Sequence, residues 1–164
     1  MATLTVWKFD TAEGADQAVE KLKSLQTQQL VEILDAATVS WPEGRKKPIT
    51  TQAYNLVGAG ALGGSFWGLL FGLIFFIPFL GAAIGAAAGA LSGYFSDYGI
   101  DNNFIKQIQN EVSEGTSALF VLTGQVTVDK VREAFQEQLS HVELLRSNLS
   151  NEQEIKLRED FGTV

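Results

Sequence analysis

The chain has 164 residues, which is enough for one small domain with an insertion. Its 12 lysines and arginines stand against 19 aspartates and glutamates, so the net charge is −7. This acidic balance argues against nucleic-acid binding, because phosphate contacts need clusters of lysine and arginine. The absence of cysteine excludes disulfides, thiolate metal sites and thiol nucleophiles. The first residues lack the charged start and long apolar run of a signal peptide.

Residues 1–54 predict the first half of an α+β domain. Asp10 and Glu13 have the spacing of a capping box at the start of a helix. The strands are indicated by alternating or β-branched runs between turn signals. The elements expected here are a strand over residues 3–9, a helix that follows and runs to about Gln26, a strand over residues 30–41 and a turn over residues 42–45. Residues 48–54 are expected to form a short strand or to lead into the segment that follows.

Residues 55–98 predict a helical hairpin, since residues 48–96 carry no charged side chain. The first arm, residues 56–77, would be about 33 Å long as a helix and would match the hydrocarbon core of a bilayer. Pro78 is expected to end the first arm and start the second, because proline cannot continue a helix but suits its first turn.

Glycine recurs at every fourth residue in both arms of this hairpin. Such rows form a groove in which another helix can approach closely, and they predict helix packing and oligomerisation. The glycines are Gly60, Gly64, Gly68, Gly72, Gly81, Gly85, Gly89 and Gly93. Two alternatives to a membrane span remain open, a buried hairpin in one soluble core and a soluble oligomer that buries its hairpins against each other.

Residues 99–164 predict the second half of the α+β domain with a C-terminal helix. The expected elements are a helix capped by Asp101 and ending near Gly115, a central strand over residues 117–123, a helix capped by Thr127, an edge strand over residues 142–149 and a last helix started by Ser150 and Gln153. The order indicates a ferredoxin-like sandwich that is interrupted by the apolar, transmembrane-type hairpin.

Three stretches together carry a likeness to a known family: residues 68–93, the Ser-Asp-Tyr-Gly-Ile-Asp run at residues 96–101, and residues 115–122. The chain resembles a family of bacterial membrane proteins of unknown function, domain of unknown function twelve-sixty-nine. The resemblance covers nearly the whole chain. It implies membrane association and carries no catalytic residue to any position of this chain.

The surroundings of the hairpin suggest how it would meet a membrane. Arg45, Lys46 and Lys47 are interpreted as membrane-surface residues attracted to anionic headgroups, or as a solvated turn. If they lie at a membrane surface, these basic residues predict that the α+β domain and both termini are on the cytoplasmic side, because lysine and arginine beside a membrane segment favour that side. The tyrosines at the two hairpin ends, Tyr54, Tyr94 and Tyr98, are expected at the membrane interface, whereas Trp67 is assigned to packing.

No catalytic, cofactor-binding or metal-binding residue is predicted. Residues 58–63 match the dinucleotide fingerprint formally, but no acidic residue follows at the required distance. His141 lacks a nucleophile–base constellation. Asp97 and Asp101 flank a tyrosine and could hold a cation, although an N-cap at Asp101 and a solvated Asp97 explain them more simply.

The sequence therefore predicts a non-enzymatic, membrane-associated homo-oligomeric scaffold or interaction protein. Its expected partners are the lipid bilayer, further copies of itself and an unidentified protein, and it needs no cofactor. The alternatives are an oligomeric pore, which would be narrow and apolar, and a self-assembling soluble particle.

Overall fold

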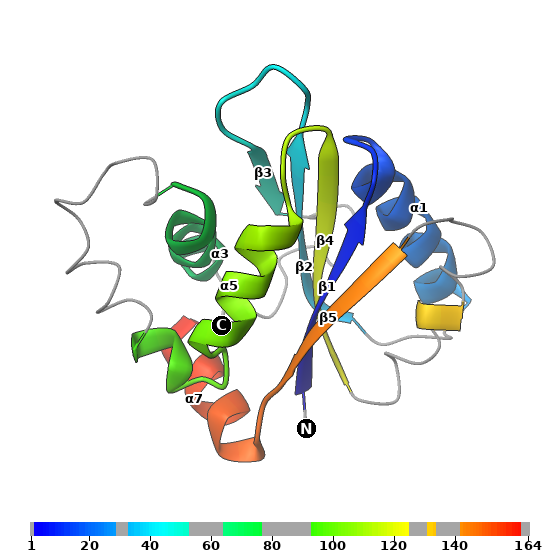
Figure 1. The fold of residues 1–164 in the computed structure, drawn as a ribbon. Helices are drawn as coiled ribbons and strands as arrows, with labels where there is room; N and C mark the ends of the chain where they lie inside the picture. Colours follow the sequence, from blue (N-terminus) through cyan, green and yellow to red (C-terminus); the bar gives the residue numbers. More distant parts are fainter. Residues whose placement is uncertain are drawn as a thin grey trace, which may run out of the picture.

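The computed structural model describes residues 2–28, 33–52, 64–76, 93–124, 131–133 and 142–161. These residues form a mixed α+β fold around one five-stranded antiparallel sheet with the order β3-β2-β4-β1-β5 (Figure 1). The strands are β1 (Ala2–Phe9), β2 (Ile33–Trp41), β3 (Ile49–Gln52), β4 (Thr116–Gly124) and β5 (Val142–Asn148).

The strand predictions are confirmed within these residues. The apolar run predicted as a central strand is β4, which pairs with β1 on one side and β2 on the other. The weakly alternating run near the C-terminus is the edge strand β5, which pairs with β1. Because β4 lies between β1 and β2, the unit β1–α1–β2 is a split β-α-β unit.

Helix α1 (Gly14–Thr27) packs on one face of the sheet (Figure 1). It buries Ala15, Ala18 and Leu22 against the sheet residues Trp7 and Leu119. Val131, within the short helical segment at residues 131–133, is buried in the same cluster. The apolar side of the predicted amphipathic helix is therefore the side that packs on the sheet.

The capping box predicted at Asp10 and Glu13 is wrong. Glu13 is the N-cap residue, but its side chain makes no capping hydrogen bond. Instead the amide of Ala15 donates to the Oγ of Ser117 at 2.8 Å, and that hydroxyl donates to the carbonyl of Thr11 at 2.7 Å. A buried serine at the start of β4 thus satisfies the helix start from the neighbouring strand.

Three helical segments cover the opposite face of the sheet: α3 (Gly64–Phe71), which continues into the π-helical segment η1 (Gly72–Phe76), α5 (Asn102–Glu111) and α7 (Asn151–Phe161) (Figure 1). Asp101 caps α5 as predicted, with its Oδ1 accepting from the amide of Phe104 at 2.8 Å. Ser150 and Gln153 form the predicted capping box of α7, with bonds of 2.8 and 3.2 Å.

The described part of the first hairpin arm is the core of this second layer. Seven apolar side chains between residues 66 and 75 are buried together with residues of β1, β2 and β4, namely Phe66, Trp67, Leu70, Phe71, Leu73, Ile74 and Phe75. This location corrects the prediction that the arm is a transmembrane-type helix in an inserted hairpin. Among the residues that the structure describes, no helix is both long and apolar enough to cross a membrane. Residues 53–63 and 77–92, with most of the predicted hairpin, lie outside the described residues.

Candidate functional site

The predicted packing glycines fall partly within the described structure. Gly64 begins α3, Gly68 lies in its middle, Gly72 begins η1 and Gly93 begins a helical turn at residues 93–96. The other predicted residues of the hairpin lie outside the described residues: Gly60, Pro78, Gly81, Gly85 and Gly89.

Helix α3 has an inner and an outer face. The inner face buries Phe66, Trp67, Leu70 and Phe71 on the sheet, whereas Gly68 and Leu69 are exposed, Leu69 by 39%. A Cβ built on Gly68, Gly72 or Gly93 would meet no atom of the described chain within 4 Å. These three glycines therefore face open space instead of a neighbouring helix of the described residues.

Aromatic rings hold the inner face to the sheet. The rings of Trp67 and Phe71 stack with centroids 5.7 Å apart, and Phe71 meets Phe120 of β4 edge-on at 5.0 Å. The assignment of Trp67 to packing is confirmed, since its side chain is buried in this cluster. Such pairs add about 0.5 to 1.5 kcal/mol each to the gain from burial.

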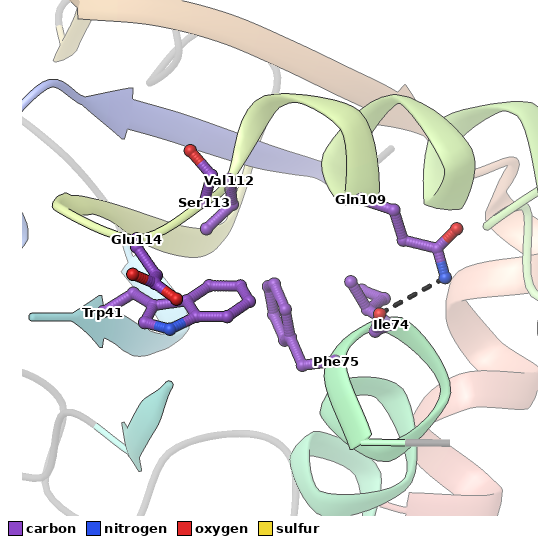
Figure 2. A pocket seen from close by; sticks show the side chains of 7 residues that line it. All are labelled: Trp41, Ile74, Phe75, Gln109, Val112, Ser113 and Glu114. Atoms are coloured by element: carbon purple, nitrogen blue, oxygen red, sulfur yellow. Dashed lines mark hydrogen bonds between the residues drawn. The ribbon is translucent and has the colours of Figure 1, made fainter. Parts of the chain in front are cut away.

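A pocket of about 660 Å³ opens between η1, α5 and the end of β2 (Figure 2). Its volume is in the range of small-molecule sites in proteins. Among the described residues its lining is mostly apolar, with three polar side chains, and consists of Trp41, Ile74, Phe75, Gln109, Val112, Ser113 and Glu114.

Hydrogen bonds and ring contacts fix the walls of this pocket. The indole Nε1 of Trp41 donates to the carbonyl of Arg45 at 2.8 Å, and its ring meets Phe75 edge-on at 6.4 Å. The Nε2 of Gln109 donates to the carbonyl of Ile74 at 3.2 Å, which joins α5 to the π-helical segment (Figure 2). Segments of π-helix occur frequently at functional sites.

The sequence did not predict this pocket. Trp41 is half-buried at the end of a strand, and the other lining residues come from segments that lie more than thirty positions further along the chain. The one local signal was a large aromatic residue placed directly before a polar turn. The spacing of Gln109, Val112 and Ser113 indicates a helix end, but not what that end faces.

Tyr98 is not an interfacial residue, which corrects the prediction for this tyrosine. Its side chain is fully buried, and its hydroxyl donates to the Oδ2 of Asp160 in α7 at 2.5 Å. Its ring contacts that of Tyr94 edge-on at 5.2 Å, and the Nζ of Lys156 lies 5.2 Å from its centroid. Tyr94 remains 38% exposed, and Tyr54 lies outside the described residues.

Burial and the hydrogen bond to Asp160 raise the pKa of Tyr98 far above its ordinary value of 10.0. When the pKa of a tyrosine is higher in the folded than in the unfolded state, its full contribution to stability is present below the pKa of the unfolded state. This contribution is lost progressively as the pH rises above that pKa. We therefore expect the wild type to lose stability between pH 10 and 11 more steeply than Tyr98→Phe, which cannot ionise. Near pH 8, Tyr98→Phe should lower the free energy of unfolding by about 1 to 2 kcal/mol through the lost hydrogen bond. Urea unfolding at both pH values measures this, and parallel pH profiles would contradict it.

Residues 61–162 match the family model described as "Protein of unknown function (DUF1269)". The chain belongs to this family. The match runs from just before α3 to the end of α7 and contains both the outer face of α3 and most of the pocket. No curated protein and no solved structure matches the chain.

The remaining predicted residues of this DUF1269 protein are placed as follows. Arg45, Lys46 and Lys47 are exposed on the turn between β2 and β3. Asp97 forms an exposed ion pair with Lys156 at 3.8 Å. Within the described residues, no group of three or more histidines, aspartates or glutamates could hold a metal ion. His141 and residues 58–63 lie outside the described residues.

Proposed function

We propose that this protein is a non-enzymatic, homo-oligomeric scaffold or interaction protein, and that its copies meet through the outer face of α3. The observation that carries the proposal is the division of α3 into two faces. One face is buried on the sheet. The other carries Leu69, which is 39% exposed, and Gly68, where a Cβ would meet no atom of the described residues within 4 Å.

Glycine in the middle of a helix costs about 1 kcal/mol relative to alanine. Gly68 and Gly72 give no compensating close contact to the described residues, since a Cβ at either position would be tolerated sterically. The compensation is supplied, in our proposal, by a helix of a second copy, which can approach the smooth surface backbone to backbone. Leu69, which is 39% exposed, adds apolar surface to the proposed contact.

The strand order β5-β1-β4-β2 supports a ferredoxin-like sandwich for the domain, with β3 added at one edge. In this proposal the segment between β3 and α5 is the insertion. Its first arm covers the sheet face opposite α1, where the inner face of α3 is buried. In this proposal the inner face of α3 belongs to the core of the domain, and its outer face belongs to the surface that contacts a second copy.

Membrane association is the second part of the proposal. With its inner face on the sheet, α3 would meet a bilayer through its outer face and lie in the interface. The exposed Arg45, Lys46 and Lys47 would add attraction to anionic headgroups of about 1 kcal/mol each, on the cytoplasmic side. A self-assembling particle without lipid is the alternative, and burial of seven apolar residues of the first arm within one chain favours it.

Gly68→Leu is expected to dissociate the oligomer or reduce its size, because a large side chain fills the surface where a second helix approaches. Gln17→Leu is the matched control, since it adds the same side chain at an exposed position of α1, on the opposite side of the sheet. Native mass spectrometry of both variants measures the subunit number. An unchanged oligomer in Gly68→Leu would exclude this face as the contact.

Flotation with vesicles separates the membrane part from the assembly part. Vesicles that contain anionic lipid should carry the wild type upward, and neutralising the basic turn (Arg45→Gln, Lys46→Gln and Lys47→Gln) should weaken that binding. An oligomer that forms normally and floats with neither vesicle type would support the lipid-free particle.

A further inference from the structure

The pocket between η1, α5 and β2 combines apolar walls with hydrogen-bond acceptors. Trp41, Ile74, Phe75 and Val112 supply the apolar surface. Among the described residues that line it, Glu114 is the only one with a charge. Glu114 and Trp41 both line the pocket (Figure 2). A ligand that fits both features needs an apolar body and a positive group.

The backbone adds to this negative potential. Helix α5 ends at Glu111, and Gln109, Val112, Ser113 and Glu114 of the pocket all belong to its last turn or follow directly. The C-terminus of a helix carries a partial negative charge that favours cations nearby. The side chain of Glu43 packs beside Gly115, so a second carboxylate lies next to the residue that follows Glu114.

The indole of Trp41 is suited to bind a cation with its face. Its Nε1 already donates to the carbonyl of Arg45, so the polar edge of the ring is satisfied within the protein. The ring lines the pocket, and cations within about 6 Å of an indole centroid gain roughly 0.5 to 2 kcal/mol. The basic side chains of the neighbouring turn are not among the residues that line the pocket.

We propose that this pocket binds a small organic cation, an ammonium group attached to an apolar chain or ring. The ammonium group lies between the carboxylate of Glu114 and the face of Trp41. The apolar body packs against Phe75, Ile74 and Val112. This binding activity goes beyond the proposed scaffold role and does not depend on it, because the pocket and the outer face of α3 are lined by different residues.

Benzyltrimethylammonium is a suitable probe, with neutral benzyl alcohol and anionic phenylacetate as comparisons. The chain has three tryptophans, and assignment of their indole N–H signals in NMR spectra by single substitution identifies the signal of Trp41. We expect the cationic probe to shift the Trp41 signal in a saturable manner at millimolar concentration. Trp7 and Trp67 are buried in the two cores and should not respond.

Glu114→Gln should weaken binding of benzyltrimethylammonium about two- to fivefold, in keeping with the loss of one partly exposed ion pair. It should leave binding of benzyl alcohol unchanged. Glu20→Gln on α1 is the matched control, because it removes one exposed carboxylate on the other side of the sheet. Three results would overturn the proposal: no saturable shift of Trp41, equal binding of phenylacetate, or equal affinity in Glu114→Gln and Glu20→Gln.

Discussion

Phe71→Ala is expected to lower the free energy of unfolding by about 3 to 5 kcal/mol, the range for removal of a buried phenylalanine. The ring is 3% exposed and lies among Trp67, Phe75 and Phe120. Its loss leaves a cavity between α3 and the sheet and removes three ring contacts at once. Urea unfolding, followed by circular dichroism, measures the change.

Leu69→Ala is the matched control for this experiment. Leu69 lies two residues away on the same helix, and its side chain is 39% exposed on the outer face. We expect its truncation to change the free energy of unfolding of the separated subunit by about 0.5 kcal/mol or less. Equal effects of the two substitutions would mean that α3 does not pack on the sheet through Phe71.

Ser117→Ala is expected to lower the free energy of unfolding by about 1 to 3 kcal/mol. The substitution removes the hydroxyl that accepts from the buried amide of Ala15, whereas the carbonyl of Thr11 keeps the amide of Gly14 as a donor at 3.3 Å. One unsatisfied buried group costs about 1 to 3 kcal/mol. The effect should also reach α1, because the serine caps that helix from β4.

Ser113→Ala provides the comparison for Ser117→Ala. Ser113 is an exposed serine before the same strand, and the hydrogen bonds that the structure gives it involve its backbone amide and carbonyl. We expect a change within about 0.5 kcal/mol. If amide hydrogen exchange in the first turn of α1 stayed the same in Ser117→Ala, the serine would not be the cap of this helix.

The strands of the sheet and the caps of α5 and α7 could be predicted because their signals are local. Alternation, turn residues and the side chains of Asp101, Ser150 and Gln153 all act within a few positions. The cap of α1 could not be found in this way, since Ser117 lies 102 positions after Ala15. The pairing of β4 between β1 and β2 brings these two residues together.

The first hairpin arm shows where composition misleads. Residues 66–77 are apolar on all sides, a pattern shared by membrane spans and by helices buried in a core. The sequence did not reveal that a five-stranded sheet leaves a whole face to be covered, or that α3 and η1 cover it together with α5 and α7. Tyr98 was misplaced for the same reason, because its partner Asp160 comes from the last helix.

The outer face of α3 and the pocket differ in how much of each could be predicted from the sequence. The glycine spacing drew attention to the segment that forms α3, and a Cβ at Gly68, Gly72 or Gly93 would meet no atom of the described residues within 4 Å. The packing groove itself stays a prediction. The pocket depends on Trp41 meeting Phe75 and on Gln109 meeting Ile74, which are contacts between separate elements. Residue spacing along one segment carries no information about such contacts.

The molar mass of the wild type in detergent-free buffer tests most directly whether copies of the chain associate. Size-exclusion chromatography with light scattering gives this mass across a dilution series. We predict one discrete species at a whole multiple of 17.8 kDa, which persists in mild detergent. A particle of 17.8 kDa at every concentration would contradict the proposed assembly, since the outer face of α3 would then have no second copy to meet.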